Sequence, residues 1–325
     1  MCRVRQVRIG LLGCGTVGGG FVRLLAHERA RIRSRFELDL TISKILVRDV
    51  DRERDDVTGM DIRGLLTDRP MDVLDDCDLV IEVLGGVHTA GTLVRRSMAR
   101  GRHVVTANKA LLAASATELF ADAARNGVAI GFEASVCGGV PVIGALRRGL
   151  AGDSIESITG ILNGTSNFIL CRMAEGLGLP EALLCAQEAG FAEADPALDL
   201  SGEDAAQKMA VLAHVAFAEP VRRCSVKGIG SVSLEMIAEA HAAGSVIRQV
   251  AEVRRVAGGV ELTVEPRWVP IGDPFARILD EQNAVRIRAR AAGEIWLSGR
   301  GAGSMPTAAA VMSDVIGCGR QRSFA

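Results

Sequence analysis

The sequence predicts an α/β fold with two domains, a parallel β-sheet covered by helices and a second, mixed α+β domain. A chain of 325 residues is longer than the roughly 100–200 residues of one typical domain. In residues 1–133, short apolar runs alternate with Ala- and Leu-rich segments, which is typical of a parallel sheet buried on both faces. A glycine-rich turn separates the first of these strands from the first helix.

The first predicted strand, residues 7–12 (VRIGLL), leads directly into a G-x-G-x-x-G turn at residues 13–18, and apolar residues then recur at helical spacing. In this motif the first glycine makes the tight turn, the second lets the backbone approach a pyrophosphate, and the third lets the helix pack on the strand. The free N–H groups of the helix start favour an anion. We therefore expect a Rossmann-type dinucleotide-binding domain, with a tight turn without ligand as the alternative. The expected cofactor contacts are Gly13, Gly15, Thr16, Val17 and Gly18.

Further strands of this domain are predicted at residues 41–47, 78–84, 103–106 and 128–132, with helices around 90–100 and 110–126. The domain is expected to span residues 1–133. A glycine turn followed by Pro306 predicts a last helix over residues 307–316, which we expect to pack back on this domain, so that residues 301–325 complete it.

The second domain is predicted to span residues 134–300. An apolar stretch at residues 158–162 runs into a polar turn at 163–167, and Ala- and Leu-rich helices follow to about residue 220. Strand-like runs return at residues 261–265 and 285–291. This order predicts a mixed α+β domain.

The second predicted strand ends in Arg48-Asp49, which bears on the choice of dinucleotide. An acid at this place binds the ribose 2′-hydroxyl of NAD, whereas an arginine accommodates the 2′-phosphate of NADP. Arg48 comes first, and Lys44 lies on the same strand. We therefore predict a preference for NADP with a contact at Arg48, while NAD stays possible and Arg48 as one more surface arginine is the alternative.

Composition excludes several classes of function. The net charge of −1 gives no reason to expect a nucleic-acid partner. No apolar run approaches the roughly 20 residues of a membrane span, so we expect no membrane partner and a cytoplasmic protein. The eight cysteines are scattered without a C-x-x-C pair, which favours reduced thiols.

Lysine occurs only at Lys44, Lys109, Lys208 and Lys227, while arginine supplies the rest of the 38 basic residues. A biased genome explains this preference for arginine in general. It does not explain the exceptions, because lysine can release a proton when its surroundings are adjusted and arginine cannot.

The densest cluster of acids lies just before Lys208 and contains Glu193, Asp195, Asp199 and Asp204. Gly190 is expected to end one helix, and Ser201 or Gly202 to start the next, on which Asp204 and Lys208 share a face. A surface ion pair is one interpretation. The apolar residues that follow favour a partly buried lysine beside a carboxylate, which is a tunable proton donor.

This segment, from Ala186 to Lys208, resembles the signature of homoserine dehydrogenases, with G-F-A-E-A-D-P followed by D-L-S-G-E-D and a lysine. The resemblance extends to DLVIEVLGG at residues 78–86, VVTANKALLA at 104–113, FEASVCGGVPVI at 132–143, GILNGTSNFIL at 160–170 and GRGAGSMPTA at 299–308. It thus covers nearly the whole chain. It implies an NAD(P)-dependent enzyme that interconverts L-aspartate 4-semialdehyde and L-homoserine, in the threonine and methionine branch of amino-acid synthesis.

The resemblance also implies roles for individual residues. Lys208 would donate the proton, and Lys109 would be a second catalytic lysine that also lies near the cofactor. The remaining implied contacts are Glu193, Asp199 and Asp204 with the substrate, Gly190 and Gly303 with the cofactor, and Glu133, Val136, Gly138 and Val140 with a sodium ion. The second domain would bind the substrate and form a homodimer.

Two alternatives stay open: another Rossmann oxidoreductase acting on an amino-acid semialdehyde or imine, and a nucleotide-binding homologue without activity. The sequence departs from the family pattern at His88-Thr89, where an acid and a proline are usual, and at Phe168, where tyrosine is common. Many relatives continue into a regulatory domain, and we expect none in this chain.

Overall fold

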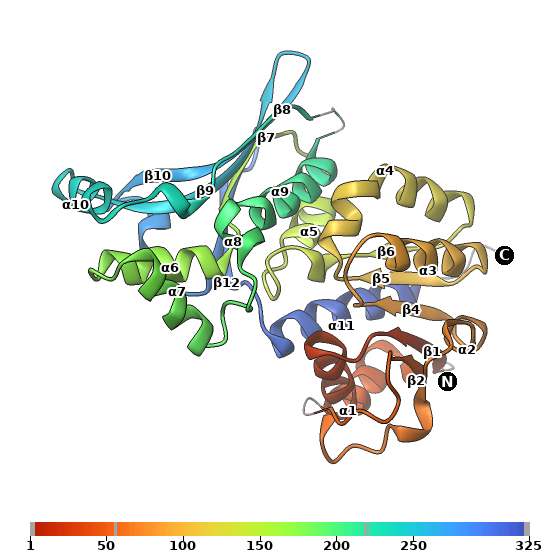
Figure 1. Ribbon diagram of the computed structural model, residues 1–325. Coiled ribbons are helices and arrows are strands. Elements are labelled where there is room, and N and C mark those ends of the chain that lie inside the picture. Colours follow the sequence, from red (N-terminus) through yellow and green to blue (C-terminus); the bar gives the residue numbers. More distant parts are fainter. Residues whose placement is uncertain (1–3, 55–56, 218, 220, 322–325) are drawn as a thin grey trace. The chain divides into compact units, whose positions relative to one another are not determined.

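The computed structural model describes residues 4–54, 57–217, 219 and 221–321. The chain divides into two compact units, Met1–Gly139 with Gly303–Ala325 and Val140–Ala302. The sequence placed the first boundary at residue 133 and the return near residue 301, whereas these units change at residues 139 and 302. Figure 1 shows both units.

The first unit is built on a parallel sheet with the strand order β3-β2-β1-β4-β5-β6. This order confirms the predicted Rossmann-type domain, because the strands run outward in both directions from β1. Its strands are β1 (Arg5–Leu12), β2 (Leu38–Leu46), β3 (Leu66–Thr67), β4 (Leu79–Glu82), β5 (His103–Thr106) and β6 (Ile130–Gly131). Its helices are α1 (Thr16–Phe36), α2 (Pro70–Asp75), α3 (His88–Ala99), α4 (Lys109–Arg125) and α11 (Ser304–Arg320).

Both faces of this sheet are covered, which explains why its strands are apolar on both sides. Phe21 of α1 and Val311 of α11 belong to one buried cluster with Ile9 of β1. Leu74 of α2 and Leu93 of α3 belong to a second cluster with Val80 of β4. The predicted return of the last helix is confirmed, since α11 packs along α1 and near β4, β5 and β6 (Figure 1).

The second unit is built on a mixed sheet with the order β12-β11-β7-β9-β10-β8, in which only the pairing of β10 with β8 is parallel among the described residues. Its strands are β7 (Ile155–Ile161), β8 (Val221–Val226), β9 (Ser245–Val256), β10 (Gly259–Pro270), β11 (Gln282–Ala289) and β12 (Gly293–Arg300). Its helices are α5 (Val142–Gly144), α6 (Gly164–Ala174), α7 (Leu179–Glu188), α8 (Ala197–Ser201), α9 (Glu203–Ala216) and α10 (Leu234–Ala242).

The mixed α+β prediction for this half is confirmed, but one element was wrong. The polar stretch after β7 is not a free turn, because Asn163 is the N-cap of α6 and its side-chain oxygen accepts a hydrogen bond from the backbone N–H of Ser166 at 2.7 Å. Asparagine is a favoured N-cap, so the polar residues form the first turn of the helix. Within the described residues, no helix is long and apolar enough to cross a membrane.

Candidate active site

The glycine turn of the first unit has the geometry that a dinucleotide needs. Gly13 has a left-handed φ of 106°, which favours glycine. A Cβ atom on Gly18 would lie 2.2 Å from the carbonyl oxygen of Gly13, so helix α1 can pack against the turn only with glycine there. A Cβ atom on Gly15 would have no protein atom within 4 Å. The fold therefore requires Gly13 and Gly18, whereas the space beside Gly15 is open to a phosphate.

The start of α11 lies against this turn. The Ser304 hydroxyl donates a hydrogen bond of 2.7 Å to the carbonyl oxygen of Thr16. Gly20 of α1 leaves room for this contact, because a Cβ atom there would lie 2.4 Å from the hydroxyl oxygen of Ser304. Gly303, the N-cap directly before Ser304, is thereby placed near Thr16, one of the predicted cofactor residues.

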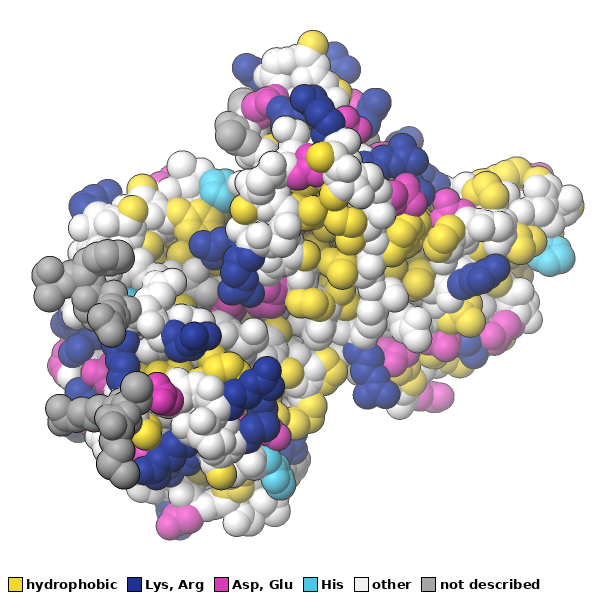
Figure 2. Space-filling model, turned by 180° about the vertical axis from the view of Figure 1, so that it is seen from behind, with side chains coloured by type: hydrophobic (Ala, Val, Ile, Leu, Met, Phe, Trp, Pro, Cys, Tyr) yellow, Lys and Arg dark blue, Asp and Glu magenta, His cyan; other side chains and the backbone are white. Residues whose placement is uncertain are grey.

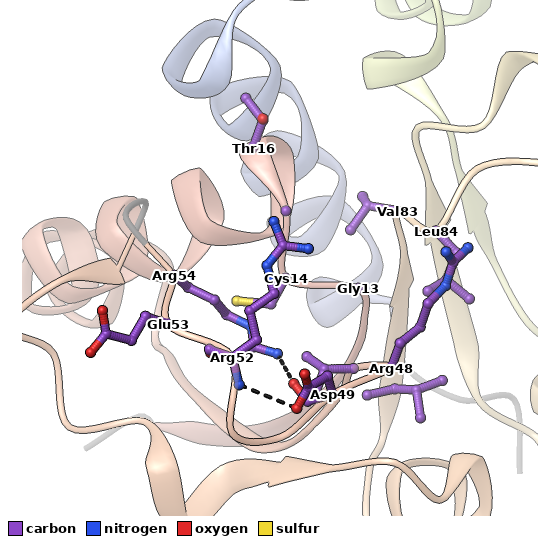
Figure 3. Close-up of a pocket in the computed structure, with 13 residues that line it drawn as sticks. Gly13, Cys14, Thr16, Arg48, Asp49, Arg52, Glu53, Arg54, Val83 and Leu84 are labelled. Atoms are coloured by element: carbon purple, nitrogen blue, oxygen red, sulfur yellow. Dashed lines mark hydrogen bonds between the residues drawn. The ribbon is translucent and has the colours of Figure 1, made fainter.

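A cavity of about 480 Å³ opens at the carboxyl ends of β1, β2 and β4 (Figure 3). It is lined by the glycine turn from Gly13 to Thr16, by the residues after β4 and by the loop after β2. A second cavity, of about 500 Å³, extends toward the start of α3, and Arg48 lines both. Lys44 does not line either cavity; its ammonium donates a hydrogen bond to the carbonyl oxygen of Gly64 at 3.2 Å.

The carboxylate of Asp49 is hydrogen-bonded within its own loop, which follows β2. The carboxylate of Asp49 accepts hydrogen bonds from the backbone N–H groups of Asp51 at 3.0 Å and Arg52 at 3.3 Å. Figure 3 shows Asp49 and Arg52 together at the edge of the cavity. The Arg54 guanidinium donates to the carbonyl oxygens of Asp49 and Arg52. The carboxylate thus caps its own loop, while the exposed side chain of Arg48 borders the cavity.

Lys109 is the first residue of α4, directly after the N-cap Asn108, at the carboxyl end of β5. Asn108 accepts a hydrogen bond from the backbone N–H of Leu111 at 3.0 Å through its side-chain oxygen. Parallel strands gather their carboxyl ends at one edge of the sheet, so Lys109 belongs to the same edge as the glycine turn.

The second unit gathers Lys208 with two of the three predicted substrate residues. The Lys208 ammonium lies 2.7 Å from the Asp204 carboxylate, and the two side chains are only 13 % and 8 % exposed. It also donates a hydrogen bond of 2.7 Å to the carbonyl oxygen of Leu162. The interpretation as a surface ion pair is wrong, because Asp204 is buried and Lys208 is partly buried.

Asn163 joins the two carboxylates of this cluster, and the sequence analysis missed it. Its side-chain nitrogen donates to Asp199 at 2.6 Å and to Asp204 at 2.7 Å. The buried Asn283 donates to the carbonyl oxygen of Leu162 at 2.8 Å, the same atom that accepts from Lys208. The available signal was a polar residue at the end of an apolar strand, which is where parallel and mixed sheets often place functional groups.

Glu193 and Gly190 lie in the segment between α7 and α8. Gly190 has a left-handed φ of 76° and ends α7, as predicted. Glu193 is exposed, and its backbone carbonyl accepts a hydrogen bond from the side chain of Gln187 at 3.3 Å. Within the described part of the chain, no hydrogen bond or ion pair joins Glu193 to the Lys208 cluster.

The four residues of the predicted sodium site lie on one segment, from Glu133 to Val140. Glu133, Val136 and Val140 are at most 6 % exposed, and the chain bends through left-handed residues at Cys137 and Gly138. One carboxylate with carbonyl oxygens fits a hard cation of low charge. Among the described residues there is no group of three or more His, Cys, Asp or Glu side chains that could hold a metal ion.

Comparison with known proteins covers both units. The family model for the homoserine dehydrogenase NAD-binding domain matches residues 13–133, and the homoserine dehydrogenase model matches residues 141–316. A homoserine dehydrogenase of Bacillus subtilis is 40 % identical over 319 residues, which cover 96 % of this chain and 73 % of that protein.

Solved structures agree with these matches. The crystal structure of a homoserine dehydrogenase from Thiobacillus denitrificans has a TM-score of 0.92 at 40 % identity and covers 97 % of this chain and 74 % of its own. A hyperthermophilic archaeal homoserine dehydrogenase in complex with NADPH has a TM-score of 0.82 at 28 % identity and covers 97 % of this chain and 98 % of its own. From the sequence, the glycine turn and the matches over nearly its full length, this chain belongs to the homoserine dehydrogenase family.

Proposed function

We propose that this chain holds its substrate at the Asp199–Asp204–Lys208 cluster and uses NADP in preference to NAD. As a member of its family, the chain is an NAD(P)-dependent oxidoreductase that acts on a CH–OH group and interconverts L-aspartate 4-semialdehyde and L-homoserine. The ion pair between buried Asp204 and partly buried Lys208 supports the first part of the proposal, and the loop after β2 supports the second.

The chemistry requires a proton at the substrate oxygen. The nicotinamide cofactor, when bound, supplies a hydride to the C4 aldehyde in one direction and accepts it from the alcohol in the other. Lys208 is proposed to hold the proton that the C4 oxygen receives, and Lys109 is proposed to be the second cation near the reacting group. Asp204 and the carbonyl oxygen of Leu162 would orient the Lys208 ammonium, since both lie 2.7 Å from it.

Asp199 and Asp204 are proposed to bind the substrate α-ammonium group, with Asn163 fixing the direction of both carboxylates. Glu193 is proposed to join them when substrate is present. The decisive measurement is the KM for homoserine. An Asp204→Asn variant is expected to raise it, and an unchanged KM with reduced kcat would count against a role in substrate binding.

The preference for NADP is supported by Arg48, whose exposed side chain borders both cavities. One carboxylate oxygen of Asp49 already accepts hydrogen bonds from two backbone N–H groups of its own loop, which turns this acid toward the loop. A guanidinium offers two aligned donors to a phosphate. We expect Arg48→Ala to lower kcat/KM for NADP while leaving that for NAD nearly unchanged. Arg125→Ala, an exposed arginine on α4, is the control, and an unchanged NADP-to-NAD ratio in Arg48→Ala would contradict the proposal.

We also propose a sodium ion bound by Glu133 and the carbonyl oxygens of Val136, Gly138 and Val140. The low exposure of the segment and its single carboxylate support this choice. Added NaCl, but not KCl at equal ionic strength, is expected to raise the melting temperature, and Glu133→Gln should remove the difference. Equal melting temperatures in both salts would exclude a selective site.

A homodimer is proposed through the second unit. Trp268, Ile271 and Leu279 of this unit are each about half exposed although they are large and apolar, and Figure 2 shows hydrophobic side chains gathered on one face. Light scattering should give twice the chain mass, and Ile271→Glu should reduce it. The cytoplasmic location and the place in threonine and methionine synthesis stay predictions.

A further inference from the structure

Glu82 is a fully buried acid that the proposed mechanism does not use. It is the last residue of β4 and is 0 % exposed. In the sheet it lies between Leu12 of β1, the residue before the glycine turn, and Thr106 of β5. The strand order reverses between β1 and β4, and such a point is where ligands bind in doubly wound sheets. An acid is therefore buried beside the cofactor edge of the sheet.

The Glu82 carboxylate accepts hydrogen bonds from two different loops. One oxygen accepts from the backbone N–H groups of Leu84 at 2.9 Å and Gly85 at 3.3 Å, in the loop after β4. The other accepts from the hydroxyl of Thr106 at 2.6 Å, at the end of β5. The Asn108 side chain donates to Glu82 at 3.4 Å and to the carbonyl oxygen of Gly86 at 2.6 Å. One carboxylate thus ties the loop after β4 to the loop after β5.

The stability of the core does not explain why a carboxylate is buried at this position. All four donors are neutral, so no cation offsets the removal of the carboxylate from water through these contacts. An ionised carboxylate is purely an acceptor with about four sites, which matches the four donors. The two preceding residues, Val80 and Ile81, fill their positions with apolar side chains. A polar network of this kind is best explained by the need for one defined arrangement of the two loops.

The network ends at Lys109. Thr106 accepts a hydrogen bond from the backbone N–H of Asn108 at 3.0 Å while it donates to Glu82. Asn108 in turn caps α4, whose first residue is Lys109. The chain of contacts from Glu82 through Thr106 and Asn108 therefore fixes the backbone from which the Lys109 side chain extends.

We propose that Glu82 is a positioning residue for the reaction: with Thr106 it locks the loops after β4 and β5 and so sets the place of Lys109. The proposal rests on the proposed role of Lys109 and adds the residues on which that role depends. Because a misplacement of about 1 Å can cost about 100-fold in rate, loosening these loops should act mainly on kcat.

Thr106→Val and Thr106→Ser form the central test, since valine has the shape of threonine without its hydroxyl and serine keeps the hydroxyl. We expect Thr106→Val and Glu82→Gln to lower kcat by about 10- to 100-fold. In Thr106→Val the dissociation constant of NADPH, measured by its fluorescence, should change by less than about threefold, because Glu82 keeps its hydrogen bonds to the loop after β4 and the glycine turn and Arg48 are untouched. Thr106→Ser should retain kcat within about threefold.

Ser97→Ala is the matched control, because Ser97 is a fully buried hydroxyl of the same unit that donates 2.7 Å to the carbonyl oxygen of Leu93 inside α3. It should lower the melting temperature and leave kcat unchanged. A Thr106→Val enzyme with wild-type kcat, or one no slower than Ser97→Ala at equal folded fraction, would overturn the proposal. Lys109→Met distinguishes the proposed role of Lys109 from that of Glu82. If Lys109→Met is inactive while Glu82→Gln is fully active, only the positioning role of Glu82 is contradicted. If Lys109→Met is fully active, the role of Lys109 and the positioning role of Glu82 are both contradicted.

Discussion

Replacing Asn163 by serine tests how the Lys208 cluster is held together. Serine keeps the N-cap of α6, which is worth about 1 kcal/mol, but it cannot reach both carboxylates. The substitution removes two hydrogen bonds to charged groups, of 2.6 and 2.7 Å, each worth about 1.5–3 kcal/mol. Their sum is about 3–6 kcal/mol, and water entering the vacated space offsets part of it. We expect the free energy of unfolding to fall by about 2–4 kcal/mol.

The effect on catalysis follows from the same contacts. If one of these hydrogen bonds is needed to keep Asp204 in place during the reaction, its loss corresponds to about 10- to 100-fold in kcat/KM for homoserine. Urea unfolding followed by tryptophan fluorescence measures the stability of the second unit, because both tryptophans, Trp268 and Trp296, lie on the sheet of that unit. Initial rates with homoserine measure the second effect.

Asn167→Ser is the matched control on the same helix. Asn167 is fully buried, and its side chain donates to the carbonyl oxygens of Ile278 at 3.1 Å and Asp280 at 2.9 Å. Its loss should cost about 1–3 kcal/mol of stability and leave kcat/KM unchanged. A normal kcat/KM in Asn163→Ser, or an equal loss of kcat/KM in both variants, would refute the idea that Asn163 orders the two carboxylates for the reaction.

Further predictions concern three other places. Lys208→Arg should lower kcat by about 100-fold without changing the NADPH dissociation constant, because arginine keeps the charge but does not release the proton. A variant with near-native steady-state rates would show that Lys208 is not the proton donor. Gly18→Ala should lower the free energy of unfolding measured in urea, because the new Cβ would lie 2.2 Å from a carbonyl oxygen. Gly15→Ala should keep this stability and weaken cofactor binding. The reverse pattern would show that the roles of the two glycines are assigned wrongly. Burial holds the pKa of His103 below its ordinary value of 6.5. Below pH 6.5 the unfolded chain therefore binds a proton that the folded chain does not, and stability present above pH 6.5 is lost as pH falls through the folded pKa. His103→Asn, which keeps an acceptor for the N–H of Ala129, should flatten this loss in urea titrations from neutral pH to about pH 5, and a slope equal to that of the wild type would show that another group is responsible.

The first unit was predictable because its signals are local. The strand that ends at Leu12 and the helix that starts at Thr16 are separated only by the glycine turn, and burial on both faces makes the strands largely apolar. The second unit was harder to predict. Strand β8 is mostly exposed and polar, and β9 carries Arg248 and Gln249 at buried positions, so neither has the apolar alternation that marks a strand.

The site was predictable where its residues lie four apart on one helix, as Asp204 and Lys208 do. It was not predictable where contacts join distant segments. Asn163 meets Asp204 across 41 positions and Glu82 meets Thr106 across 24, and single-sequence patterns carry no signal over such separations. Asn163 also had a sufficient local explanation as a turn residue, which hid its second role.

The position of α11 in the chain has a consequence for how the protein is made. Residues of the first unit leave the ribosome before those of the second, yet the surface of α1 that α11 covers stays uncovered until residues 304–320 have been translated. The unit that begins synthesis first is thus completed last, after all of Val140–Ala302 has emerged. During that interval Phe21, Val22 and Leu25 of α1 lack the α11 residues with which they share one buried cluster, so apolar surface of the first unit stays open to water until the last helix has been made.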